Sequence, residues 1–106
     1  MDYPQFIEAT HIVWCANTAS WIDQAAAATG RSVDPSTVEA TRLACWHEGR
    51  RYKAADLLGA LAVNNLVCRQ VAPFFASHDL LLTPTAAQPP LPLGLVNADD
   101  PALDVG

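Results

Sequence analysis

Apolar residues recur at helical spacing over most of the chain, beginning near its N-terminus. A first helix is predicted over residues 4–29, where Trp14 and Trp21 fall seven residues apart on one face. Asp2 is placed to accept from the free amides of the first turn, and Gly30 is a residue typical of a helix end. The pattern therefore predicts a long helix with one heavily aromatic face.

Two further helices follow in the same pattern. One is expected over residues 35–48, because Asp34 and Pro35 together form a strong helix start signal. The other is expected over residues 54–75, with Pro73 bending or ending it. Apolar residues lie nearly all the way round this third helix, so we expect several neighbouring elements to bury it.

The pattern changes after Asp79. Residues 80–83 form a short apolar run between turn-forming residues, which predicts a strand buried on both faces. The tail over residues 84–106 is rich in proline and is expected to run as extended or irregular chain. The sequence offers no comparable second strand, and each buried backbone group without a partner costs about 1–3 kcal/mol. We therefore expect this chain to be a piece of something larger, or to pair with a second copy of itself.

Composition supports a mostly α chain and narrows the classes of function. The 106 residues suffice for one domain, and a 51% apolar fraction with only five glycines favours packed helices. A formal net charge of -5 argues against nucleic acid and anionic membranes as partners. Neither a membrane span nor a signal peptide is recognised, so a cytoplasmic location is expected.

Three cysteines stand far apart, at positions 15, 45 and 68. Their number and spacing fit neither a disulfide framework nor a metal site with closely paired ligands. His11 and Cys15 share a helix face, and Cys45 and His47 would join them only if the first two helices packed face to face. We interpret these residues as core thiols with core or surface histidines, and we expect no metal site and no cofactor.

One stretch of the chain carries a family resemblance. Residues 74–85 read Phe-Phe-Ala-Ser-His-Asp-Leu-Leu-Leu-Thr-Pro-Thr, and a Pro-Pro-Leu-Pro-Leu-Gly run follows at 89–94. Preceded by a long Ala/Leu helix, this stretch resembles the F-x-x-y-D-x-L-l-T-P-t segment of amidase-signature enzymes, with His78 where Tyr is commoner. The first helix, with the run Trp14-Cys15-Ala16-Asn17, looks most like the branch that hydrolyses small amides and cyclic aminohexanoate oligomers.

The resemblance implies an α/β parent fold, in which helices flank a mixed sheet. It also implies hydrolysis of carboxamide C–N bonds by acyl transfer to a serine, with a second serine on a cis peptide and a lysine base. Those residues belong to a Gly- and Ser-rich segment that this sequence does not contain, since Lys53 is the only lysine and no serine lies in a Gly-rich loop. The resemblance therefore assigns no catalytic residue here, and it implies a non-catalytic internal segment of the enzyme.

Three residues of the first helix are candidates for lining a substrate pocket in the intact enzyme, because aromatic walls with a few polar groups suit small amides. They are Trp14, Cys15 and Asn17. The Ser-His-Asp order at residues 77–79 resembles a hydrolase triad, but neighbouring residues are expected to point apart and to form a turn. The tryptophans, with Phe74 and Phe75, are predicted to be core.

Two interpretations of function stay open. In the first, the partners are the remainder of the amidase fold, and a small amide is bound only by the intact enzyme. In the second, the chain is a stand-alone helical protein-interaction module, forming a homodimer. Either way, exposed apolar surface is expected to drive self-association when the chain is made alone.

Overall fold

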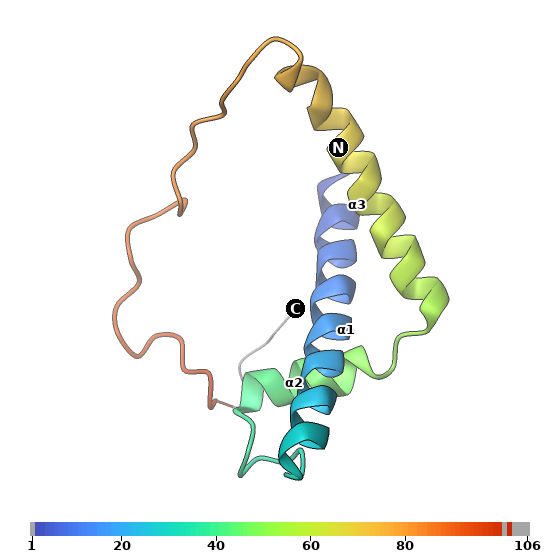
Figure 1. Cartoon of the computed structure of the whole chain (residues 1–106). Coiled ribbons are helices and arrows are strands. Elements are labelled where there is room, and N and C mark those ends of the chain that lie inside the picture. The colour runs from blue at the N-terminus through green and yellow to red at the C-terminus, as the bar shows by residue number, and fades with distance from the viewer. Residues whose placement is uncertain (1, 101, 103–106) are drawn as a thin grey trace.

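The computed structural model describes residues 2–100 and 102, and these residues form three helices. They are α1 (Tyr3–Thr29), α2 (Ala40–Gly49) and α3 (Ala54–Phe75). α1 stands in the centre, α2 crosses its C-terminal half, and α3 lies against its N-terminal half (Figure 1). Both α2 and α3 pack on α1 rather than on each other. The predicted mostly α character is confirmed.

The ends of α1 form as the sequence predicts. A carboxylate oxygen of Asp2 accepts from the Gln5 amide at 3.2 Å, which satisfies a free donor of the first turn. At the other end, Gly30 adopts a left-handed conformation with φ of 68°, and its amide donates to the Ala26 carbonyl at 2.8 Å. Glycine reaches this conformation without a steric penalty, so the helix stops here.

α2 begins later than the predicted range of 35–48, at Ala40. The preceding residues form a turn around Asp34, whose carboxylate accepts from the Ser36 amide at 2.8 Å and from the Ser32 hydroxyl. These hydrogen bonds lower the pKa of the Asp34 carboxyl, and the bond from Ser32 has the largest effect. Asp34 thus caps a local turn instead of a helix, because short polar side chains compete with helical hydrogen bonding.

Small residues make up most of the buried core. The buried side chains are those of Ala9, Cys15, Thr18, Ala19, Ile22, Cys45 and Ala60. The predicted aromatic core on α1 is wrong, because Trp14 is 52% exposed and Trp21 is 72% exposed. α2 approaches α1 so closely that a Cβ added to Gly49 would lie 2.1 Å from the Cys15 carbonyl oxygen. Helices can meet at this separation only through small side chains.

α3 is far less covered than its sequence predicts. Leu58, Leu61 and Leu66 on its outer side are 66%, 47% and 52% exposed. Among the described elements α3 packs against α1 alone, so the several neighbours predicted from its apolar circumference are not there.

The predicted buried strand at residues 80–83 is wrong. These residues form no strand, and Leu80, Leu81 and Leu82 are 84%, 57% and 98% exposed. A strand needs a partner to satisfy its backbone groups, and no other described residue supplies one, so the segment lies in water. The tail arcs away from the helices and returns at α2 (Figure 1), where the Thr41 amide donates to the Ala98 carbonyl at 3.0 Å.

The chain as a whole is more open than a compact domain of its size. Its accessible surface is 8275 Å², whereas the mass predicts roughly 5700 Å² for a folded monomer. Its radius of gyration is 17.2 Å, against about 13 Å expected for this length. Much apolar surface that a compact domain of this size would bury is therefore exposed in this chain.

Candidate functional site

The crossing of α1 and α2 gathers most of the polar contacts between elements. Asp23 of α1 binds two side chains at once: the indole of Trp46 in α2 donates to one oxygen at 2.8 Å, and the guanidinium of Arg50, directly after α2, donates to the other at 2.6 Å. The same guanidinium lies 5.1 Å from the centre of the Trp46 ring. Arg50 and Asp23 are about half exposed, so water screens their attraction and the geometry serves mainly to fix the crossing.

Two thiols meet beneath this crossing. Cys15 is fully buried and Cys45 is 5% exposed, and the Cys45 thiol lies close enough to Cys15 to influence its pKa. The His11 ring lies one turn before Cys15, with Nε2 3.6 Å from Sγ. The pKa of Cys15 is raised to about 12, mainly because the thiol is buried and secondly because the Cys45 thiol is nearby. At neutral pH the Cys15 sulfur is therefore a protonated thiol and a poor nucleophile in this environment.

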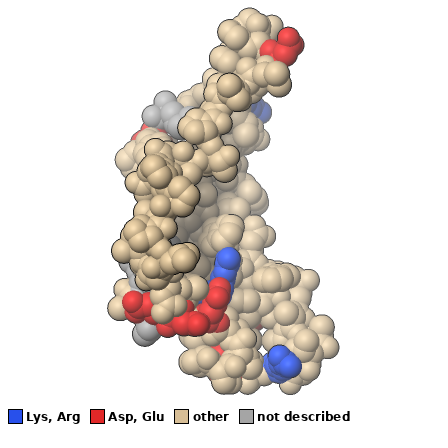
Figure 2. Space-filling view, turned by 90° about the vertical axis from the view of Figure 1, so that its left-hand side faces the viewer, with Lys and Arg blue, Asp and Glu red and all other residues tan. Residues whose placement is uncertain are grey.

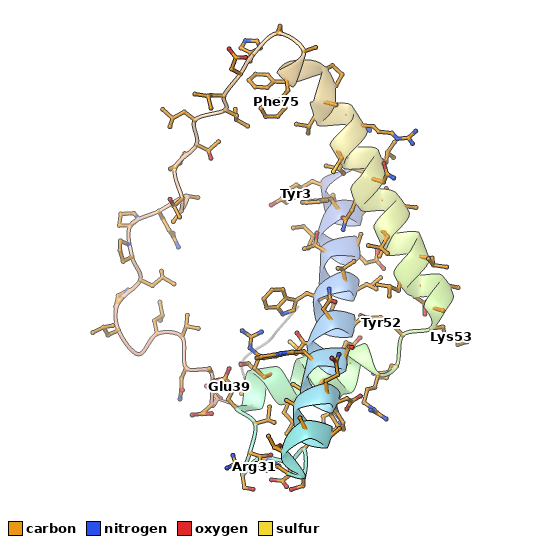
Figure 3. All side chains as sticks on the ribbon, in the orientation of Figure 1. Tyr3, Arg31, Glu39, Tyr52, Lys53 and Phe75 are labelled. Carbon is orange, nitrogen blue, oxygen red and sulfur yellow. The ribbon has the colours of Figure 1, made fainter. Side chains whose placement is uncertain are left out.

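A hollow between α1 and α3 has an aromatic and acidic lining. Tyr52, in the link between α2 and α3 (Figure 3), contributes to its wall together with Glu8 and Asp56. The Tyr52 hydroxyl donates to a Glu48 carboxylate oxygen at 3.0 Å. Burial and this bond raise the pKa of Tyr52 to about 12, so the phenol keeps its proton and acts as a donor.

The structure does not bring the three predicted pocket residues onto one surface. Trp14 lies under the Arg42 guanidinium, 5.2 Å from the ring centre, and borders a hollow that the returning tail closes at Ala98. Cys15 is buried toward α2, and Asn17 is exposed. Whether these residues line a substrate pocket in an intact enzyme stays a prediction.

The Ser-His-Asp run at 77–79 behaves partly differently from our expectation. Ser77 and His78 do not point apart, because Ser77 Oγ lies 3.0 Å from His78 Nδ1. The His78 ring stacks on Phe74 at 4.3 Å between centres, and all of these groups are exposed. No hydrogen bond joins Asp79 to His78 in the described chain. The run therefore lacks the relay that a triad needs.

The described residues were compared with two kinds of site, a serine activated by a lysine and a metal-binding group. No serine there is hydrogen-bonded to Lys53, whose own amide donates to Asp56 at 2.8 Å. Residues 2–100 and 102 also hold no group of three His, Cys, Asp or Glu side chains placed to bind a metal ion. His11, Cys15, Cys45 and His47 thus form no four-ligand site, although α1 and α2 do pack face to face.

Sequence reasoning missed the role of Asp23, and it placed Cys45 near Cys15 only on the condition that the first two helices pack face to face. The two cysteines are thirty residues apart, a spacing that says nothing about proximity. A usable signal was the pair Cys45 and Gly49, which lie four apart on one face of α2. A small residue and a glycine at that spacing indicate a face built for close helix contact.

No family model, no curated protein and no solved structure matches this chain. Within the described residues, no helix has the length and apolar character needed to cross a membrane. The amidase resemblance thus depends on the residues quoted for it at 14–17, 74–85 and 89–94.

Proposed function

We propose that this chain is the non-catalytic helical part of an amidase-signature hydrolase, with an α/β parent fold that cleaves carboxamide C–N bonds by acyl transfer to a serine. The resemblance at residues 74–85 motivates the family. In this proposal the rest of the enzyme supplies the Ser-Ser-Lys segment and the sheet. The chain itself supplies helices, the Leu-rich segment and, through Trp14 and Asn17, part of a pocket wall.

The observation that carries the proposal is the exposure of the Leu-rich tail. Residues 80–98 contain no charged side chain, and Leu82 and Leu93 are essentially fully exposed. Charged side chains are few on the face that the tail covers, and they gather toward its ends (Figure 2). An uncharged surface of this extent favours a covering partner, because apolar patches beyond a few hundred Å² rarely stay in water.

The segment that resembles the amidase motif is also the part with the least support from its own chain. Between Asp79 and Asn97, no backbone hydrogen bond reaches any of the three helices in the described structure. The outer leucines of α3 extend the same uncovered surface. Both features fit a segment that packs into a larger fold, and neither depends on a strand being present now.

The direct test begins with activity. The purified chain is expected to release no product from a chromogenic small amide and to take no label from a fluorophosphonate probe, because it lacks the nucleophile. Hydrolysis that the probe abolishes would contradict the proposal. The DNA on both sides of the reading frame is then read. We expect a Gly/Ser-rich signature upstream and a Gly-x-Pro-Ala segment downstream, in frame or one frameshift away.

A complementation experiment sharpens the test. The flanking segments encoded by that DNA are co-expressed with this chain, and amidase activity and co-purification are measured. We expect both with the wild-type chain and with Gln88→Ser, an exposed polar control in the same tail. Leu82→Ser is expected to reduce both. Failure of the wild-type pair to associate, or absence of the signature from the DNA, would overturn the proposal.

A helical interaction module is the second candidate, and the packing of α2 and α3 on one central helix favours it. A self-sufficient module is expected to melt cooperatively and to form a defined dimer in sedimentation, whereas a segment of a larger enzyme is expected to lose helix gradually. A sharp transition together with a stable dimer, and no amidase signature in the flanking DNA, would favour the module.

A further inference from the structure

The packing of α1 on α2 places two thiols together at its tightest point. Cys45 and Gly49 share one face of α2, and the Gly49 backbone lies directly against the Cys15 carbonyl. Cys45 is therefore buried on the face of α2 that packs against α1 beside Cys15, and its thiol contributes to the raised pKa of Cys15. All three cysteines are free thiols, and the third, Cys68, is exposed on α3.

We propose that Cys15 and Cys45 form a redox-modification site, in which a low-molecular-weight disulfide such as glutathione disulfide oxidises them to a disulfide that joins α1 to α2. This assignment does not depend on the proposed function. It goes beyond the core-thiol interpretation of the sequence, because spacing alone gave no reason to pair these two residues.

The chemistry proceeds in two exchanges. Cys45, the less buried thiol, gives its proton to water and attacks one sulfur of the glutathione disulfide, so that a mixed disulfide forms and one glutathione leaves as a thiolate, which takes up a proton from water. Cys15 then gives its proton to the adjacent His11 ring, and its sulfur attacks the Cys45 sulfur. The second glutathione leaves and takes up that proton. Two electrons pass from the two cysteines to the glutathione disulfide, which is reduced to two thiols.

The burial of the pair determines how the site behaves. With Cys15 fully buried and Cys45 at 5% exposure, the oxidant reaches them only when α2 lifts from α1. Reaction is therefore slow in the folded chain, and reduction of the finished bond is slow for the same reason. The product closes the loop that contains the second half of α1 and the Asp34 turn, which restricts the unfolded chain and favours the helix crossing.

The test equilibrates the full chain in a glutathione redox buffer, traps free thiols by alkylation and maps the products after trypsin digestion. We expect the peptide 1–31, which contains Cys15, to be linked to the peptide 43–50, which contains Cys45, with the loss of two hydrogens in mass. The peptide 54–69 is expected to carry alkylated or glutathionylated Cys68. Recovery of 1–31 and 43–50 as separate peptides would overturn the proposal.

The same oxidation in denaturant provides the control for chance pairing. In an unfolded chain the shortest loop closes most readily, so Cys45 and Cys68, which are 23 residues apart, are expected to pair most often. A switch from that pair to Cys15–Cys45 on folding is the expected result. The same mixture of pairs in both conditions would contradict a site made by the fold.

Two variants test whether the disulfide depends on the Cys15–Cys45 pair and not on the third cysteine. Cys68→Ser is expected to leave the Cys15–Cys45 link and its redox equilibrium unchanged. Cys45→Ala is expected to abolish the link and to remove the rise in unfolding midpoint that oxidation gives the wild-type chain. Circular dichroism of the reduced variants checks that both keep their helices, and the wild-type peptide map decides the proposal even if Cys45→Ala does not fold.

Discussion

The α1–α2 crossing differs from the region formed by α3 and the tail in which side chains it buries and which it leaves exposed. At the crossing, small residues let two backbones touch, and Asp23 binds both Trp46 and Arg50. In the other region, long apolar side chains are exposed on α3 and along residues 80–96. The two regions have similar apolar content, so hydrophobicity alone does not decide which surface is buried.

The comparison shows which of the two regions buries its apolar side chains within this chain. Burial at the crossing is reached within the chain, because both partner helices are present and their small residues match. α3 and the tail carry apolar side chains whose burial needs further surface. Changes at the crossing should therefore alter the stability of the chain, and changes in the tail should alter its association.

The largest effect is expected from Gly49→Ala. The new Cβ would lie 2.1 Å from the Cys15 carbonyl oxygen, so the helices must separate. We expect a loss of about 3 kcal/mol in the free energy of unfolding, measured by urea denaturation. Gly59→Ala is the matched control, because it is also helical and has nothing within 4 Å of its Cβ position. It should stabilise the chain by about 0.5–1 kcal/mol. Equal effects of the two variants would mean that the helices do not touch.

A smaller effect is expected from Asp23→Ala. This change leaves the Trp46 indole without its acceptor and should cost about 1.5 kcal/mol, mostly through that lost bond. Glu39→Ala removes the exposed pair with Arg42 on α2, at 3.5 Å, and should cost under about 0.5 kcal/mol. The loss in the free energy of unfolding of both variants is measured by following tryptophan fluorescence during urea denaturation. A cost for Glu39→Ala as large as that for Asp23→Ala would remove the distinction between the crossing and an ordinary surface.

Next comes Gly30→Ala, at the end of α1. Alanine is strained at the φ of 68° that this position requires, and the loss should be about 1 kcal/mol. Gly94→Ala imposes comparable strain at a φ of 83°, but in the tail, where no helix ends. Thermal melts followed by circular dichroism should show a lower midpoint for Gly30→Ala alone. A matching loss for Gly94→Ala would show that the tail contributes to the stability of the helices.

The smallest effect on stability is expected from Leu82→Ser. The side chain is 98% exposed, so the free energy of unfolding should change by less than about 0.5 kcal/mol. Association is the sensitive readout, and sedimentation velocity should show less self-association than in the wild-type chain. A loss of stability above about 1 kcal/mol would show that this part of the tail packs against the helices in solution.

Local signals predicted the local structure well. Asp2 and Gly30 fix the ends of α1 through bonds to residues three and four positions away, so sequence reasoning located them correctly. The prediction for α2 was less accurate because Asp34 can cap either a helix or a turn, and its own serines supply the turn. The strand at 80–83 was wrong because an apolar run becomes a strand only beside a partner.

Sequence reasoning was sufficient to establish that this chain is mostly helical and acidic. Those properties follow from local spacing, capping and composition, which need no knowledge of distant contacts. That small residues rather than tryptophans form the core, and that Cys45 is buried beside Cys15, became evident only from the packing of the helices. The physical reason is that helix packing selects faces by fit at a given separation, and fit depends on two surfaces that lie far apart in the chain.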